Sequence, residues 1–383
     1  MIPSVSGGIG HISRTATLAR ALQRLDPAVE VEYLLDAARL RPFNIDATRR
    51  MGFRPRFLPL LTRDNRDAVA RACLDDAHMV VDDCSRYLLL LRRAVPHVGW
   101  ITLAMYPLHD ELFMDWPLMA QMDAVVWPYA PLVGVPDELG LVMDKVVQTG
   151  PFLDTEAVPD KAAARTRLGL SEGEPFVLYA PRGFPFGREF GHRVLAAAYG
   201  AAQALRQGPH PQLRLVLLAV SDAADLRGIP GVPDPLPDWV SVQGVVTPAE
   251  ALLHTRAADI VVGEGTSTMH EGAALRTPLV LVPGPIAEVT LLAQALDREC
   301  AATVLTLQQA SPATFGSAFR AALDGNHEHR AMLDRAHALV TGGGGALAAA
   351  RVVLDIAARR RAVEQFAGSG LLGEAVEQCR ERR

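Results

Sequence analysis

The chain has 383 residues, 49% of them hydrophobic and 21% charged, and its formal net charge is −5 at pH 7. This length exceeds what one hydrophobic core usually organises, so we expect two domains of roughly 150 to 200 residues each. The acidic balance argues against a broad nucleic-acid-binding face, and no uncharged apolar run reaches the roughly 18 residues of a transmembrane segment. Because Met1–Val5 lacks the basic and apolar regions of a signal peptide, we expect a soluble, cytoplasmic protein.

Cysteine spacing excludes two further classes of protein. The four cysteines are scattered, without the C-x-x-C or Cys/His spacing of a zinc site: Cys73, Cys84, Cys300 and Cys379. This pattern argues against a structural metal and against a disulfide framework. We interpret them as core or incidental thiols and expect no metal site.

The N-terminal segment predicts a strand, a glycine turn and a helix. The apolar stretch Met1–Val5 runs into S-G-G-I-G-H-I-S-R, and Thr15–Leu25 then has apolar residues at helical spacing before a second strand, Glu30–Leu35. A glycine turn at this place is where doubly wound sheets bind ligands. The motif is not G-x-G-x-x-G, but Asp36 lies near the end of the second strand, so a dinucleotide-binding dehydrogenase stays open from this stretch alone.

Three residues of this turn are candidates for ligand contact. Gly8 and Gly10 allow close approach of a ligand to the backbone. His11 could act as a general base near neutral pH or donate a hydrogen bond to a phosphate. The alternative is a histidine that only caps or packs the helix N-terminus.

A second polar group follows at the end of a later strand. Met79–Val81 reads as a buried strand that ends in Asp82 and Asp83. Carboxylates at this place face the cleft of a parallel sheet or, alternatively, cap the next helix. The elements expected after them are a helix over Tyr87–Ala94, strands over Val98–Leu103, Ala124–Trp127 and Val146–Gly150, and a linker over Asp154–Asp160.

The strand and helix rhythm then restarts, which indicates a second α/β unit. Phe176–Ala180 is its first strand, followed by a loop with Arg182 and Gly183. A threonine and a proline at Thr247–Pro248 mark a helix start. The other expected elements are a helix over Arg193–Leu205 and strands over Leu213–Val220 and Val240–Val242.

The stretch from residue 257 to residue 283 is the strongest candidate for an anion site. Ala257–Val262 predicts a buried strand that stops at G-E-G, and Thr266, Ser267 and Thr268 then open a helix over Met269–Leu275 before the strand Leu279–Val282. The free N–H groups of such a helix suit a phosphate. Glu271, one turn into the helix, is placed to accept hydrogen bonds from ribose hydroxyls. The alternative is an ordinary capped helix with a solvated acid.

The C-terminal part is predicted to be mainly helical. The helices are expected over Ile286–Asp297, Pro312–Leu323, His329–Val340 and Ala346–Gln365, with a short strand over Thr303–Leu305. The four glycines Gly342–Gly345 lack a preceding strand, so we interpret them as a flexible joint rather than a phosphate loop.

The two glycine motifs, Gly7–Arg14 and Gly263–Pro283 with its continuation to Ala295, resemble those of GT-B glycosyltransferases. The resemblance is to family 28 and to the related nucleotide-sugar hydrolases of nonulosonic acid biosynthesis. It implies an α/β protein with two Rossmann-like, doubly wound parallel-sheet domains facing each other across a cleft. The domains implied are an acceptor side over 1–153, a nucleotide-sugar side over 161–345, and a helix and tail over 346–383 that could cross back to the first domain.

The resemblance also assigns roles to the site residues. Gly265 and the hydroxyl residues Thr266, Ser267 and Thr268 would hold the donor diphosphate, and Glu271 the ribose. Val245 and Val246 match the segment whose backbone reads the base, usually uracil, and His11 matches a base or phosphate contact. Glu288 keeps an acid of the next helix, whereas Thr290 and Leu291 stand where the family 28 enzyme has two glutamines. The further donor contacts that we expect are Gly8, Gly10, Arg182 and Gly183.

These residues lead to one main hypothesis and two alternatives. The main one is transfer of a sugar from a nucleotide diphosphate donor, UDP-linked and without any other cofactor, to an unidentified acceptor. Since the Asp-x-Asp of metal-dependent transferases is absent from the sequence, we expect no metal requirement. The alternatives are a hydrolase with water as acceptor and a catalytically silent nucleotide-sugar-binding protein. The acceptor could be lipid-linked or a small metabolite. The apolar stretch Trp100–Trp116 could line an acceptor pocket, form a lipid-facing patch, or simply pack in the core.

Overall fold

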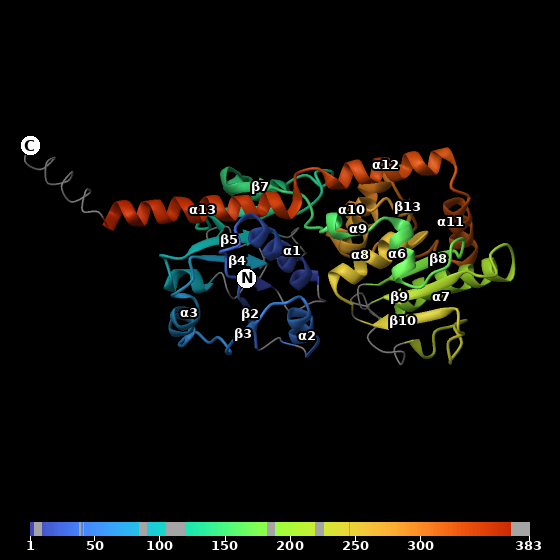
Figure 1. Ribbon diagram of the computed structural model, residues 1–383, viewed down its shortest axis with the longest axis horizontal. Coiled ribbons are helices and arrows are strands. Elements are labelled where there is room, and N and C mark those ends of the chain that lie inside the picture. The colour runs from blue at the N-terminus through green and yellow to red at the C-terminus, as the bar shows by residue number, and fades with distance from the viewer. Residues whose placement is uncertain are drawn as a thin grey trace, which may run out of the picture.

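The computed structural model describes residues 1–3, 10–37, 40, 42–83, 90–104, 119–181, 188–218, 226–244 and 246–368. Within them the chain forms two α/β units that lie side by side, each built on a parallel sheet (Figure 1). The α/β class with two doubly wound parallel sheets, predicted from the sequence, is confirmed.

The first unit has the strand order of a doubly wound sheet. Five strands pair in the order β1-β4-β5-β6-β7, and β2 pairs with β3 beside them. A hydrogen bond of 2.9 Å from Leu34 N to Met1 O joins β2 to the N-terminal strand, so the full order is 3-2-1-4-5-6-7. The strands are β1 (Ile2–Pro3), β2 (Tyr33–Asp36), β3 (Pro55–Leu58), β4 (Met79–Asp83), β5 (Gly99–Leu103), β6 (Ala124–Trp127) and β7 (Val146–Gln148).

The second unit repeats this topology with its own strands. Its sheet has the order β10-β9-β8-β11-β12-β13, all pairs parallel. The central strand β11 is apolar and fully buried because helices cover both of its faces. The strands are β8 (Phe176–Ala180), β9 (Arg214–Leu218), β10 (Val240–Gly244), β11 (Ile260–Gly263), β12 (Leu279–Leu281) and β13 (Thr303–Val304).

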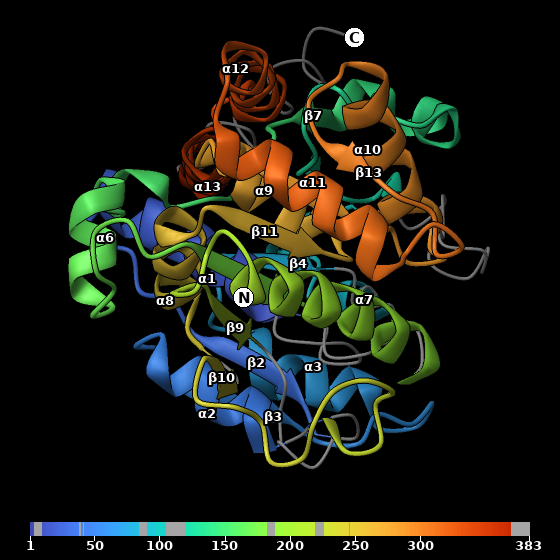
Figure 2. The ribbon, with the colours of Figure 1, turned by 90° about the vertical axis from the view of Figure 1, so that its right-hand side faces the viewer.

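Alternation along β11 sends successive side chains into two cores. Val262 packs with α7 (Arg188–Gln207) and α11 (Pro312–Asp324), which lie together over one face of the sheet (Figure 2). Val261 packs on the other face with Met269 and Leu292. The helices of that face are α8 (Pro248–Ala257), α9 (Thr266–Ala274), α10 (Ala287–Arg298) and α12 (His327–Thr341), with α6 (Lys161–Arg167) against α8.

Several elements differ from the sequence-based expectation. Helix α1 (Gly10–Leu25) begins at Gly10 rather than at Thr15. Of the helix expected over Tyr87–Ala94, the described part is a 3-10 turn, η1 (Leu90–Ala94), and residues 87–89 lie outside the described residues. The expected linker contains the 3-10 turn η4 (Thr155–Ala157). The sequence analysis did not predict α2 (Pro42–Arg50), β3 or α3 (Arg66–Leu74), nor the 3-10 segment η3 (Asp137–Lys145). These elements are short, with four to nine residues each, so they contain too few repeats to show a clear hydrophobic period.

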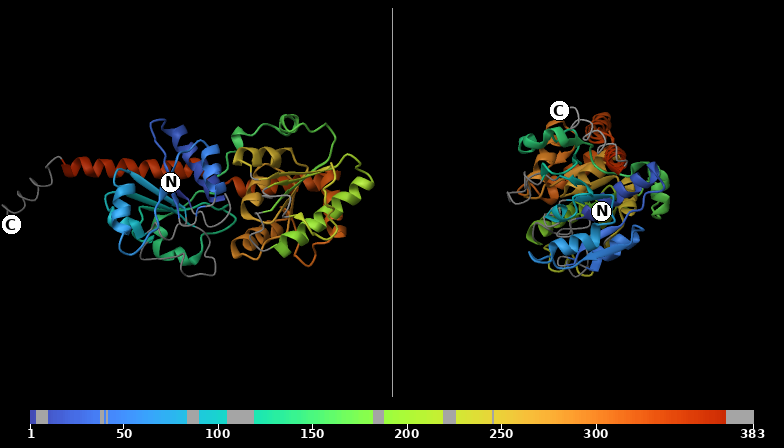
Figure 3. Two further views of the ribbon diagram at one scale, coloured as in Figure 1. Left: turned by 90° about the horizontal axis from the view of Figure 1, so that it is seen from below. Right: turned by 90° about the vertical axis from the view of Figure 1, so that its left-hand side faces the viewer.

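The C-terminal helix returns to the first unit. Helix α13 (Gly345–Gly368) runs along the first sheet (Figures 1 and 3), where Ala349, Ala350 and Val353 pack with Leu18 and Leu22 of α1. By length and composition the stretch His327–Val363 is apolar enough to cross a membrane. Here it is two helices, α12 and α13, and the apolar face of α13 is part of the core.

The glycine run between α12 and α13 makes a close crossing of two backbones. Gly345 N donates to Thr149 O at 2.6 Å. A Cβ on Gly150, whose φ is 78°, would lie 2.5 Å from Gly342 O, and a Cβ on Gly343 would lie 2.8 Å from Thr149 O. The interpretation as a flexible joint was wrong, because these glycines lack side chains in order to let the two connections between the units touch.

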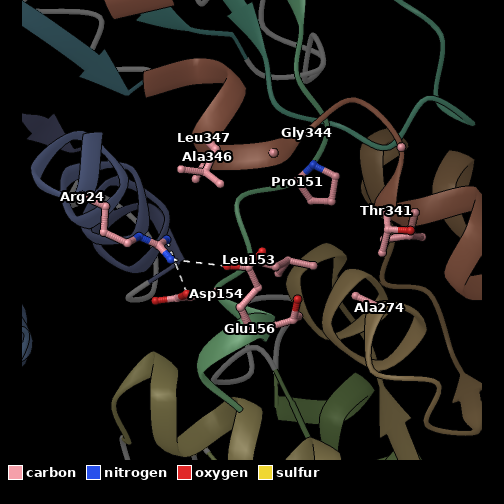
Figure 4. A pocket seen from close by; sticks show the side chains of 14 residues that line it. Arg24, Pro151, Leu153, Asp154, Glu156, Ala274, Thr341, Gly344, Ala346 and Leu347 are labelled. Carbon is pink, nitrogen blue, oxygen red and sulfur yellow. Dashed lines mark ion pairs between the residues drawn. The ribbon is translucent and has the colours of Figure 1, made fainter. Parts of the chain in front are cut away.

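A small cavity lies beside this crossing. It has a volume of about 190 Å³ and is lined by both connections and by Arg24 of α1. Arg24 pairs with Asp154 at 3.5 Å and with Glu156 at 3.8 Å across its mouth (Figure 4). These ion pairs are partly exposed and each contributes little on its own. Buried apolar residues of both units, among them Trp127 and Met269, belong to one hydrophobic core, so the contact between the units combines this core with the backbone crossing.

The crossing predicts a large effect of one methyl group. Gly150→Ala should lose roughly 2 to 4 kcal/mol of stability, because a left-handed φ costs about 1 kcal/mol and the clash with Gly342 O roughly 1 to 3 kcal/mol more. Gly169→Ala is the matched control, since its φ is 67° and its Cβ would meet open space. Urea unfolding of both variants measures the difference. Equal midpoints for the two variants would contradict the proposed contact.

Candidate functional site

A charged cluster lies where α1 begins and β4 ends. Asp83, the last residue of β4, is fully buried. Arg14 Nε donates to Asp83 Oδ2 at 3.1 Å, and Arg14 Nη2 donates to Oδ1. His11 Nδ1 lies 3.2 Å from Asp83 Oδ2 and 3.3 Å from Arg14 Nη2. Asp83 thus forms a buried ion pair with α1, whereas the residues that it could cap, 84–89, lie outside the described part of the chain.

The charges of this cluster depend on each other. Burial alone would raise the pKa of Asp83, but the positive charge of Arg14, with contributions from His11, outweighs it and lowers the pKa to about 2. Asp83 is therefore a carboxylate at every physiological pH. The side chains of His11 and Arg14 keep 14% and 18% of their surface exposed, so both can be reached by a ligand.

The N-terminus of α9 is uncapped within the described part of the chain. Its N-cap is Gly265, and none of the described side chains caps it. The Thr266 hydroxyl donates to Glu288 Oε1 at 2.7 Å instead, and the Thr268 hydroxyl contacts Ala180 O at 3.5 Å. The alternative in which Thr266 only caps the helix is therefore wrong, and Gly265 rather than Ser267 is the N-cap residue. The first N–H groups of α9 are left for an anion.

The two glycine motifs meet in space. A Cβ built on Gly10 would lie 3.8 Å from Oγ of Ser267, so the start of α1 in the first unit lies against the start of α9 in the second. Both helix starts carry partial positive charge. The arrangement brings His11 and the anion site of α9 to the same place, which sequence spacing alone did not establish.

Carboxyl groups surround the start of α9. Glu264 is fully buried, and burial raises its pKa to about 7, although the Tyr179 hydroxyl donates to its Oε1. Glu271 is half-buried, and burial raises its pKa to about 7 as well. The second carboxylate oxygens of Glu264 and Glu288 have no hydrogen-bond partner in the described part of the chain. The sequence analysis did not single out Glu264 as a site residue, although an acid between two glycines was a visible signal.

His270 is a further residue that sequence reasoning missed. It is buried in α9, its Nε2 has no partner among the residues described, and its ring lies 6.4 Å from that of Tyr129. Burial and the charge of Arg14 lower its pKa to about 3. The charge of Arg14 therefore acts on α9 as well as on Asp83.

The remaining predicted residues lie at several places. Val246 is half-buried just before α8, whose Thr247 and Glu250 form a complete capping box. The Thr290 hydroxyl contacts Gly284 O at 3.4 Å. Outside the described residues lie Gly8, Arg182, Gly183, Val245 and most of the apolar stretch Trp100–Trp116, including Met105, Tyr106, Leu108, Phe113 and Met114.

Comparisons with known proteins support the fold. No family model matches the sequence, and no curated protein matches it. The calicheamicin glycosyltransferase CalG4 superposes with a TM-score of 0.58 at 19% identity, covering 92% of this chain and 96% of its own. A UDP-GlcNAc 2-epimerase from Neisseria meningitidis, bound to UDP-GlcNAc, gives 0.62 at 10% identity over 94% and 98%. MurG of Acinetobacter baumannii gives 0.55 at 14% identity over 93% and 98%.

These likenesses confirm the GT-B fold that the sequence motifs implied, with a family 28 glycosyltransferase among the neighbours. The identities are low, so the comparisons show the architecture and leave the reaction to the site itself. In this fold the two doubly wound units face each other, which agrees with the meeting of Gly10 and Ser267.

The raised pKa of Glu264 predicts a fall in stability with rising pH. The folded state keeps the proton up to about pH 7, whereas the unfolded state loses it near the ordinary value of 4.5. Stability is therefore lost between these values, by up to about 3 kcal/mol. Glu264→Gln keeps an acceptor for Tyr179 without a charge, so it should be more stable than wild type at pH 8.

Thermal unfolding at pH 5 and pH 8 checks this prediction, with the exposed Glu172→Gln as control. The pKa of Glu271 is also raised, so Glu271 should account for part of the dependence of stability on pH that remains in Glu264→Gln. If Glu264→Gln shows the same loss of stability between these pH values as wild type, the assignment to Glu264 is wrong.

Proposed function

We propose that the protein is a cytoplasmic, metal-independent glycosyltransferase that takes a sugar from a UDP-linked donor. The observation that carries the proposal is the meeting of the His11 cluster with the uncapped start of α9. A diphosphate at α9 would accept hydrogen bonds from the N–H groups at the start of this helix, and His11 would lie beside the sugar. The acceptor is a small metabolite or a lipid-linked molecule.

The reaction would use the site as follows. His11 removes the proton from the acceptor hydroxyl or amine, while Asp83 holds the ring and stabilises the positive charge that develops on it. The helix start of α9 stabilises the negative charge on the departing nucleoside diphosphate. Glu271 accepts hydrogen bonds from the ribose hydroxyls, away from the bond that breaks.

A hydrolase is the second candidate, because the Asp83, Arg14 and His11 cluster could activate a water molecule in the same way. Incubation of the protein with a panel of UDP-sugars separates the two reactions. Free sugar released in equal amount with UDP, without any acceptor, supports the hydrolase. Conversion into an epimeric nucleotide sugar would contradict both.

Nucleotide binding tests the placement of Glu271. Glu271→Ala should weaken UDP binding by about 1.5 to 3 kcal/mol, which is roughly ten- to a hundredfold in affinity, because charge-assisted hydrogen bonds are lost. Calorimetry is best made near pH 8, since the raised pKa of Glu271 leaves the carboxyl partly neutral below pH 7. The exposed helical residue Glu328 provides the control variant Glu328→Ala. Unchanged affinity in a folded Glu271→Ala protein would remove the donor from α9.

The metal requirement has its own test. Turnover should persist in excess chelator, because the helix start of α9 takes the place of a cation at the diphosphate. Loss of activity in chelator that magnesium or manganese restores would refute metal independence.

His11→Ala should reduce turnover by a factor of roughly 10² to 10⁴ with little change in the Michaelis constant for donor.

A further inference from the structure

One nitrogen of His11 lies between a donor and an acceptor. Its Nδ1 is 3.3 Å from Arg14 Nη2 and 3.2 Å from Asp83 Oδ2. These neighbours demand opposite protonation states of Nδ1, because a guanidinium can only donate and an ionised carboxylate can only accept. A neutral imidazole has one proton, so Nδ1 can satisfy only one of them.

The contacts favour Arg14 as the partner of Nδ1. Both oxygens of Asp83 already accept from Arg14, Oδ2 from Nε at 3.1 Å and Oδ1 from Nη2. Arg14 Nη2 and His11 Nδ1 have the geometry of a hydrogen bond at 3.3 Å, and Asp83 Oδ2, which lies 3.2 Å from Nδ1, already accepts from Arg14 Nε. Because Arg14 must donate, Nδ1 accepts and the proton of the neutral ring is on Nε2.

We propose that Arg14 is a positioning residue that sets the tautomer of His11, holding the ring proton on Nε2 until an anionic group of the ligand takes over its guanidinium N–H. With Nε2 protonated, the ring presents a donor to the ligand and cannot remove a proton through that atom. His11 becomes a base only after Arg14 Nη2 has left Nδ1.

The anion that fits is the diphosphate of the donor, and in this respect the inference rests on the proposed function. The charge of Arg14 acts on His270 of α9, and Gly10 lies against Ser267, so Arg14 is close to the anion site. Guanidinium groups bind phosphate strongly and in a directed way. Asp83 can retain its two hydrogen bonds from Nε and Nη2, since a guanidinium has five N–H donors.

The exchange conserves protons and charge. A phosphate oxygen replaces Nδ1 as the acceptor of one Nη2 hydrogen of Arg14. Nε2 then gives its proton to water, and Nδ1 takes a proton from water. The new Nδ1–H donates to Asp83 Oδ2, and the lone pair of Nε2 is then available for the acceptor. A base would thus form only when the donor is bound.

The tautomer of His11 can be read directly by NMR. Protein labelled with ¹⁵N-histidine is measured at pH about 8.5, where an ordinary imidazole is neutral, and His11→Gln identifies the signals of this ring among the 11 histidines. Without ligand we expect the Nε2–H tautomer. An Nδ1–H tautomer in the unliganded wild type would overturn the inference, and His11→Gln serves only to assign the signals.

Ligand and variant complete the test. Saturating UDP should shift the ring toward Nδ1–H, and Arg14→Met should show Nδ1–H without ligand. Arg20→Met removes another guanidinium from α1, one that contacts Met51 O rather than His11, and should leave the tautomer on Nε2. A folded Arg14→Met protein with Nε2–H, or a UDP complex with Nε2–H, would refute the role of Arg14.

Failure of the proposed function gives a different result. If UDP does not bind, the donor site at α9 is wrong, while the unliganded spectrum and Arg14→Met still decide whether Arg14 sets the tautomer. If UDP binds and the tautomer stays on Nε2, the donor site stands and the coupling to Arg14 is refuted.

Discussion

The buried charge of Asp83 is the constraint on which the candidate site depends. An isolated carboxylate without solvent costs several kcal/mol, and this one is kept ionised by Arg14 and His11. Because both partners lie in the first turns of α1, the ion pair fixes the start of that helix to the end of β4. The start of α1, with Gly10, is thereby held at the carboxyl edge of the sheet, where it lies against α9 of the second unit.

The second constraint is steric and lies at the connections between the two units. Three glycines, Gly150, Gly343 and Gly345, let the chain after β7 contact the turn before α13. A Cβ on any of them would clash with a backbone oxygen. Since α13 is part of the core of the first unit, the C-terminal end of the chain ties both units together. The meeting of His11 with α9 therefore depends on contacts far from either residue.

The sequence by itself determined the class of fold and most of the second unit. Runs such as Val261–Val262 are apolar on both faces, which only a sheet covered by helices satisfies, and the Thr247 capping box and the G-E-G turn are local signals that need no partner. The sequence also predicted that Thr266, Ser267 and Thr268 open a helix and that Glu271 lies one turn into it, as α9 shows. Short elements such as the nine-residue helix α3 were not predicted, because so few turns do not show a hydrophobic period that distinguishes them from loops.

Only the tertiary structure decided which residues act together. Arg14 and Asp83 are far apart in the sequence, so their ion pair, and with it the competition for His11 Nδ1, is a product of packing. The same holds for His270 and Glu264, whose pKa values are shifted mainly by burial. It also holds for the glycine run, because a sequence shows only that glycines can bend the chain and not what they contact. Local patterns report the energies of neighbours along the chain, whereas desolvation and contacts between distant segments exist only once the chain has closed on itself.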